Sequence, residues 1–214
     1  MRKAWIFLKE KGLDFEHRQL DPLDKSERFL SMNPLGRIPI LEEPDGNLIA
    51  DSSVICDYLE NVHPEPSLYP AAYRDRARAL WFEEYADTLL TQICARVFWM
   101  YIIIPIRTGA PTDQAEVDAF RDEEFPAAFD YLESVAPDED GLVNNCFSVA
   151  DISVASAVRL LDLAGAPLDA ERWPRFEAYY RRVIGRPSAK SIIEEELSAT
   201  EVFRATGNAP GYHD

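Results

Sequence analysis

The sequence has little positive charge for its length. Its 214 residues include 22 lysines and arginines but 38 aspartates and glutamates, so the formal net charge is −16. A surface this acidic repels the phosphates of nucleic acids and the headgroups of anionic lipids, and we expect neither as a partner. An anionic ligand would have to be captured locally, by helix ends or by single basic side chains.

Cysteines and long apolar runs are also scarce. Cys56, Cys94 and Cys146 are the only cysteines, and they form no C-x-x-C pair. An odd number of scattered cysteines favours free thiols in a reducing compartment. The first residues, MRKAWIFLKEKG, return to charge too soon for a signal peptide, and no uninterrupted apolar run approaches the ~18 residues of a membrane span. We therefore expect a cytoplasmic protein that does not enter the membrane.

Metal-binding and nucleotide-binding motifs are absent from the sequence. The three histidines, His17, His63 and His213, have no acid or cysteine at metal-ligand spacing. There is neither a GxxxxGK[ST] phosphate loop nor a GxGxxG turn. We expect no metal cofactor.

Proline divides the chain into two parts. The segment HPEPSLYP, residues 63–70, has three prolines in eight positions and can be neither a helix nor a central strand. We interpret residues 63–72 as a linker between a mixed α/β domain, residues 1–62, and an all-helical domain, residues 73–214. The fold class expected is therefore α/β plus all-α.

Within residues 1–62 the pattern alternates between helix and strand signals. It predicts helices over 2–12 and 52–61, a strand over 15–20, a short helical or irregular link over 26–32, and a hairpin of strands 38–42 and 47–50. Pro44, Asp45 and Gly46 supply the turn of that hairpin.

Residues 73–214 carry helical signals. Apolar side chains at every fourth position predict a helix over 73–104, with a stripe formed by Ala77, Trp81, Tyr85, Leu89, Ile93 and Val97. A second long helix begins near Thr112 or Asp113. Ser148 and Asp151 form a capping box, flanked by a staple of Phe147 and Ile152, at the start of a helix that should run through the centre of the domain. Two more helices follow.

A candidate ligand site lies in NPLGRIPILEEPDGNLIADSSVICDYLE, residues 33–60. A cis bond between Ile38 and Pro39 would turn the backbone of Ile38 outward, where it could pair with a peptide-like ligand. The helix beginning at Ser52 points free N–H groups at the same region and would bind a carboxylate, while Asp51 would accept hydrogen bonds from an amine. An α-amino acid head, with one carboxylate and one ammonium, matches this pair.

Each of these features has a simpler explanation. Pro39 can begin an edge strand in trans, and Ser52 or Ser53 can be only an N-cap. Taken singly, the simpler explanation wins at each position. Taken together at this spacing, with the hairpin between them, they favour a ligand site.

The same residues resemble the glutathione-binding half of cytosolic glutathione transferases. NPLGRIPIL and ADSSVICDYLE match that family's N-P-x-G-x-[VI]-P-x-L and [ED]-S-x-x-I-x-x-Y-L, and the resemblance extends to KAWIFLKEKGLDFE, FSVADI and RVIGRPSAK. It therefore covers almost the whole chain. It implies a thioredoxin-like N-terminal domain, an all-helical C-terminal domain, a homodimer, and the transfer of glutathione, as co-substrate, to a small electrophile.

The resemblance also implies roles for individual residues. Ile38 would hydrogen-bond the cysteinyl backbone of glutathione, and Pro39 would be the cis proline. Asp51 and Ser52 would hold the γ-glutamyl head, and Arg37 would lie near the ligand. Ser148 and Asp151 match a structural motif, so their role would be in folding.

Other residues keep two interpretations. Lys25 is a candidate for the glycyl carboxylate or a solvated loop lysine. Cys56 is a candidate nucleophile or an idle thiol. A set of aromatic residues is either core or the lining of an electrophile pocket: Trp81, Tyr85, Phe98, Trp99 and Tyr101.

The resemblance identifies no catalytic residue. In the family a strand and a loop precede the first helix, and the loop carries the serine, cysteine or tyrosine that lowers the pKa of the glutathione thiol. Here Met1 stands at the edge of that helix. Either the true N-terminus lies upstream, or the chain is a shortened relative. The second case favours a non-catalytic binding or regulatory module, and a weaker third idea is a structural dimer component without a ligand.

Overall fold

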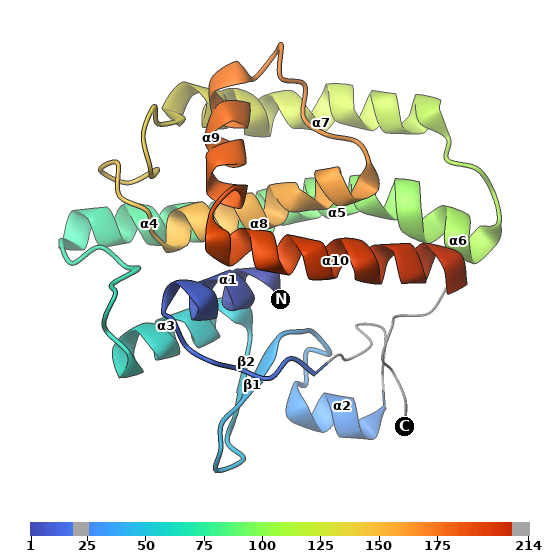
Figure 1. Ribbon diagram of the computed structural model, residues 1–214. Helices are drawn as coiled ribbons and strands as arrows, with labels where there is room; N and C mark the ends of the chain where they lie inside the picture. Colours follow the sequence, from blue (N-terminus) through green and yellow to red (C-terminus); the bar gives the residue numbers. More distant parts are fainter. Residues whose placement is uncertain (19–25, 207–214) are drawn as a thin grey trace.

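The computed structural model describes residues 1–18 and 26–206. Figure 1 shows a small part with a hairpin below a larger layer of helices. The small part holds α1 (Arg2–Glu10), α2 (Glu27–Met32), β1 (Ile40–Glu42), β2 (Leu48–Ala50) and α3 (Ser52–Val62). The helical part holds α4 (Tyr73–Tyr85), η1 (Ala86–Leu90), α5 (Thr91–Phe98), η2 (Trp99–Ile103), α6 (Ile104–Thr108), α7 (Gln114–Val135), α8 (Val149–Ala164), α9 (Pro174–Ile184) and α10 (Pro187–Thr206).

The predicted hairpin is confirmed. Strands β1 and β2 pair antiparallel, with Leu41 opposite Ile49. The turn between them closes by a hydrogen bond from the N–H of Glu43 to the carbonyl of Asn47, and Gly46 takes a φ of +87° that glycine adopts without steric cost. The hairpin therefore places the residues before β1 next to those after β2.

The strand predicted over residues 15–20 is not formed over its described part. Residues 15–18 do alternate between half-buried and exposed side chains, as a strand on a core does. They pair with no strand, however, because the sheet of the described residues contains only β1 and β2. Alternation reports which face is buried, whereas a strand also needs a hydrogen-bonded neighbour.

Helix α1 connects the small part to the helical layer. Residues 3–8 are all buried, including the ammonium-bearing Lys3, because α1 packs against α3 on one side and against α8 and α10 on others. The helix ends at Glu10 and Gly12 follows with a φ of +66°, so the predicted helix over 2–12 is confirmed with a slightly earlier end.

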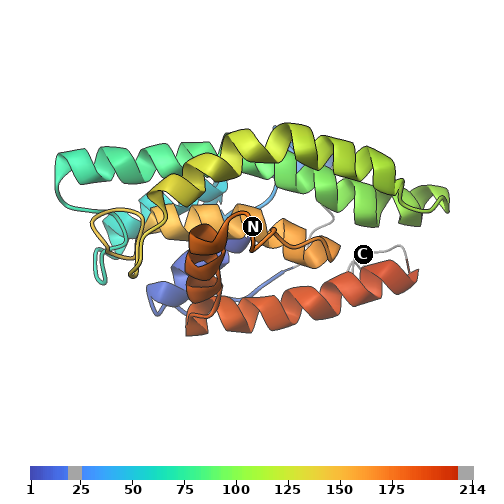
Figure 2. The same cartoon turned by 90° about the horizontal axis from the view of Figure 1, so that it is seen from above.

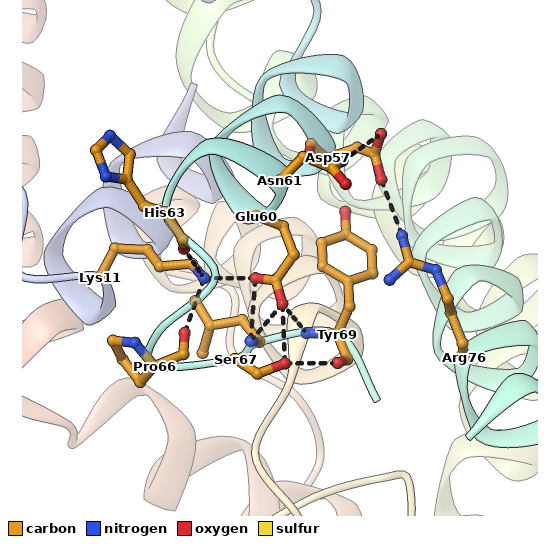
Figure 3. Close-up of polar contacts among 10 residues, drawn as sticks. Lys11, Asp57, Glu60, Asn61, His63, Pro66, Ser67, Tyr69 and Arg76 are labelled. Carbon is orange, nitrogen blue, oxygen red and sulfur yellow. Dashed lines mark hydrogen bonds and ion pairs between the residues drawn. The ribbon is translucent and has the colours of Figure 1, made fainter. Parts of the chain in front are cut away.

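A buried ion pair connects the linker segment to α1 and α3 (Figure 3). The ammonium of Lys11, just after α1, lies 2.5 Å from the carboxylate of Glu60 on α3 and donates to the carbonyls of His63 and Pro66 at 2.7 and 2.8 Å. Glu60 in turn accepts from the N–H groups of Leu68 and Tyr69. These contacts fix the path of the proline-rich segment. The boundaries at 62 and 73 stay a prediction.

The predicted long helix is confirmed and runs further, from Tyr73 to Thr108, with π-helical turns at η1 and η2. The stripe predicted for it is wrong at its start, because Ala77 and Trp81 are exposed. A strict spacing of four residues drifts about 40° per step around an α-helix and leaves the core face. Further along, the predicted Ile93 and Val97 are buried, and the buried residues that the stripe missed include Ala79, Phe82, Ala86, Leu90 and Cys94.

This long helix also meets a length and composition test for crossing a membrane. An 18-residue window in it has a mean hydropathy of 1.7 and is 33% buried. The sequence contains no uninterrupted apolar run of that length, but the test tolerates two charges. Core helices of soluble proteins pass it too, so the helix is weak evidence for a membrane.

Helix α8 forms the centre of the helical part. Figure 2 shows it running through the middle of the molecule, between the long helix and α10. It packs against α4, α5, α1 and α9, and none of its residues is exposed. Its capping box of Ser148 and Asp151 is present as predicted, as is the cap of α7 by Asp113. The expectation of a central helix is therefore confirmed.

Candidate functional site

The turn before β1 presents an unpaired stretch of backbone. The bond between Ile38 and Pro39 is cis, as the ligand hypothesis required. Among the described residues no group pairs with the N–H or the carbonyl of Ile38. The residue is half-buried, so part of it is open to solvent. Such a backbone can hydrogen-bond an extended peptide.

Asn33 organises this turn, and sequence reasoning missed it. The residue is buried, its side-chain amide donates to the carbonyl of Arg37 at 2.8 Å, and its side-chain oxygen accepts from the N–H of Leu35 at 3.1 Å. Asparagine before proline is a common turn signal, because its side chain satisfies backbone groups two residues on. That signal was present in the sequence and would have identified Asn33.

The start of α3 forms the second half of the site. Asp51 is its N-cap, and the carboxylate accepts from the N–H groups of Ser53 at 2.8 Å and Val54 at 3.3 Å. The alternative that Ser52 or Ser53 is the cap is therefore wrong. Since Asp51 already fills the cap, the Ser52 hydroxyl and N–H remain without a partner among the described residues.

The backbone of Asp51 is strained. Its φ is +82° with ψ of 137°, outside the regions that L-residues usually occupy. Such a conformation costs on the order of 1–3 kcal/mol and is concentrated at ligand sites, where the surroundings over-determine it. Here Asp51 is held by the two N–H groups it caps and by its own N–H, which donates to the carbonyl of Pro39 at 3.3 Å.

That last hydrogen bond brings the two halves of the site together. It sets the turn at Ile38 and Pro39 beside the open end of α3, although the hairpin separates them in sequence. Arg37 is exposed at the edge of the turn. Lys25 lies outside the described residues. The result is a strip of hydrogen-bond donors and acceptors suited to a zwitterionic, peptide-like ligand.

Cys56 does not take part in this chemistry. It is fully buried on α3, and burial raises the pKa of its thiol, so no thiolate forms near neutral pH. The interpretation as an idle thiol is the one that fits. No group of three or more potential metal ligands occurs in the described part of the chain.

The candidate pocket aromatics divide between two environments. Trp81 stacks on Tyr85 with ring centroids 5.1 Å apart, and both rings contact Tyr131 of α7. These rings therefore join two helices. Phe98 and Tyr101 are half-buried, and Trp99 is exposed.

Comparison with known proteins places the chain in a family. Residues 1–62 match the model of the glutathione S-transferase N-terminal domain, and residues 114–182 match that of its C-terminal domain. The crystal structure of a glutathione S-transferase from Rhodospirillum rubrum F11 is 30% identical, covers 88% of this chain and 84% of its own, and superposes with a TM-score of 0.78. The chain belongs to the glutathione S-transferase family.

Two further relatives of this glutathione transferase span nearly its whole length. Protein LigF of Sphingobium sp. strain SYK-6 is 29% identical in an alignment 231 positions long that covers 90% of this chain and 88% of LigF. A glutathione S-transferase of Methylobacterium radiotolerans, solved in complex with glutathione sulfonate, is 26% identical with a TM-score of 0.70 and covers 89% of this chain and 87% of its own. The expected fold, a small N-terminal sheet domain with a helical domain, is confirmed, and the transferase is glutathione-dependent.

Proposed function

We propose that this glutathione transferase binds the γ-glutamyl group of glutathione at Asp51 and Ser52 and the cysteinyl backbone at Ile38. One observation carries the proposal: the hydrogen bond between Asp51 and Pro39 sets the unpaired backbone of Ile38 beside the open end of α3. The Methylobacterium relative was solved with a glutathione derivative, which supports glutathione as the ligand.

The charges of the site fit the two ends of the glutamyl head. The free N–H and hydroxyl of Ser52, at the positive end of the α3 dipole, would donate to the α-carboxylate. Asp51 uses one carboxylate oxygen to cap the helix, and the other is free to accept from the α-ammonium. Arg37 would lie near the ligand, and Lys25 is the candidate partner of the glycyl carboxylate. In this arrangement the protein binds an anionic peptide despite its own net negative charge, because the positive end of α3 and the Asp51 carboxylate act locally on the two charges of the glutamyl head.

We further propose a small electrophile as second substrate, a homodimer as assembly and the cytoplasm as location. The half-buried Phe98 and Tyr101 are suited to an apolar electrophile. Tyr73, Leu80 and Trp81 leave an apolar area exposed on α4, which a second copy would cover.

The first test of the binding site is the Ser52→Ala variant. The hydroxyl has no partner in the described protein, so its removal should leave the fold intact and cost one hydrogen bond to a charged ligand group. We expect the dissociation constant for glutathione, measured by titration calorimetry, to rise about tenfold. The matched control is Ser134→Ala, an exposed serine on α7 whose hydroxyl bonds only within its own helix. Equal affinities for the wild type and Ser52→Ala would refute the site.

The second test separates catalysis from binding alone. We expect the protein to conjugate glutathione to a generic aromatic electrophile faster than the uncatalysed reaction, followed by absorbance of the conjugate. Glutathione binding without any rate above background would instead support the non-catalytic module.

A further inference from the structure

A polar cluster around the buried Lys3 lies next to the proposed glutamyl site, and it joins the two parts of the fold. The ammonium of Lys3 on α1 donates to the hydroxyl of Ser53 on α3 at 2.7 Å. It also pairs with Glu83 on α4 at 3.0 Å and with Asp87 on η1 at 2.5 Å. The Ser53 hydroxyl completes the cluster by donating to the same oxygen of Asp87 at 2.9 Å.

Burying the charged ammonium of Lys3 costs free energy, which the polar contacts of the cluster must offset. Only 3% of the residue is exposed, and a buried ammonium loses several kcal/mol of hydration. Here its three N–H donors have three acceptors, two of them charged. Burial alone would lower the pKa of Lys3, but the carboxylates of Glu83 and Asp87 outweigh it and raise the pKa, so the group stays charged at neutral pH.

Ser53 transmits this arrangement to the ligand site. Its hydroxyl is held from one side by Lys3 and from the other by Asp87, so its side chain has one orientation. Its backbone N–H is the closer of the two donors to the Asp51 carboxylate, and Ser52 lies between these two residues. A fixed Ser53 therefore fixes the first turn of α3, including the strained Asp51 and the free donors of Ser52.

We propose that Lys3 is a positioning residue for the γ-glutamyl end of glutathione. It does not touch the ligand. It holds Ser53 and Asp87 so that the open end of α3 has the binding geometry before glutathione arrives, and it does so across the boundary between the small part and the helical layer. This inference rests on the proposed binding site.

The test compares two buried lysines at opposite ends of α1. Lys3→Met removes the charge beneath α3, and Lys11→Met removes an equally buried charge that contacts Glu60, at the far end of α3. Steady-state kinetics are measured at a temperature at which circular dichroism shows both variants folded. We expect Lys3→Met to raise the KM for glutathione about tenfold while kcat at saturating glutathione stays within about twofold. Lys11→Met should leave both values unchanged, because a general loss of stability does not alter KM.

A second variant keeps the inference testable if Lys3→Met does not fold. Ser53→Ala removes only the hydroxyl that joins Lys3 to Asp87 and leaves the ion pairs intact, and we expect KM to rise about threefold. An unchanged KM in Lys3→Met, or in Ser53→Ala where Lys3→Met fails to fold, overturns the inference, as does an equal rise in Lys3→Met and Lys11→Met. If Ser52→Ala weakens binding while these variants do not, the inference alone fails. If the wild type does not bind glutathione, the proposed site fails and the inference with it.

Discussion

Replacing Asp151 by asparagine is expected to lower the free energy of unfolding by about 3 kcal/mol, because buried donors lose their acceptor. Asp151 is fully buried at the third position of α8. One of its oxygens accepts from the N–H of Leu142 at 2.9 Å and from the hydroxyl of Tyr179. The other accepts from the N–H of Ser148 at 2.8 Å and from its hydroxyl. Burial raises the pKa of Asp151 to about 6, so at neutral pH the group is an ionised acceptor for all four donors.

Asparagine cannot replace this carboxylate in either orientation. Each oxygen faces one backbone N–H, so the amide nitrogen of asparagine always opposes a donor that cannot rotate away. The measurement is chemical denaturation followed by circular dichroism. The control is Asp140→Asn. Asp140 is an exposed aspartate in the loop between α7 and α8, and its replacement should change the free energy of unfolding by less than about 0.5 kcal/mol. Equal stability of the two variants would show that the capping box does not hold α8.

The capping box was predictable because its signal is local. Ser148 and Asp151 are three residues apart, and their types alone specify the cap. The same holds for the turn at Pro44, Asp45 and Gly46. The start of α3 was predicted at the right residue, but its cap was left between Ser52 and Ser53, since the sequence does not show that Asp51 takes a positive φ.

Contacts between distant residues left no such signal. Lys3 and Asp87 are 84 residues apart, and no spacing rule connects an α1 lysine with a π-helical turn. Lys11 sits in LKEKG, which reads as the solvated end of a helix, yet its ammonium is buried. The long helix was predicted from its period, but the fourfold spacing marked the wrong residues in its first turns, where Ala79 and Phe82 are buried and Trp81 is exposed. In each case tertiary packing decided the side chain's environment.

The ion pair of Lys11 and Glu60 gives the second large effect. Lys11→Met should lower the free energy of unfolding by about 3–5 kcal/mol, because it leaves a carboxylate buried without its cation. Glu60 is 8% exposed and is surrounded by the linker segment, so water cannot replace the ammonium easily. The carbonyls of His63 and Pro66 lose their donor as well. Lys9→Met, on an exposed position of the same helix, is the control and should lose less than about 0.5 kcal/mol.

A double variant tests whether the lost free energy of unfolding comes from the ion pair between Lys11 and Glu60. In Lys11→Met with Glu60→Gln no buried charge remains, and a glutamine oxygen in the place of Oε1 can still accept from Ser67, Leu68 and Tyr69. We expect the double variant to regain about 2 kcal/mol relative to Lys11→Met alone. A double variant as unstable as the single one would mean that Lys11 acts through its carbonyl contacts and packing, and that its charge is incidental.

The difference in free energy of unfolding between wild type and Lys11→Met should depend on pH, with a sign set by the pKa of Glu60. Burial would raise the pKa of Glu60, but the hydrogen bond from Lys11 and those from Ser67 and Leu68 outweigh it and lower the pKa below its usual range. A carboxylate with a lowered folded-state pKa stabilises the fold above its unfolded-state pKa of about 4.3, and this contribution is lost as the pH falls through the folded-state pKa. In Lys11→Met the cation is gone and only the hydrogen bonds from Ser67 and Leu68 still oppose burial, so the pKa of Glu60 rises and the variant should be penalised most near neutral pH. The stability difference between wild type and Lys11→Met should therefore narrow between neutral pH and pH of about 4, whereas a difference caused by packing alone would stay constant.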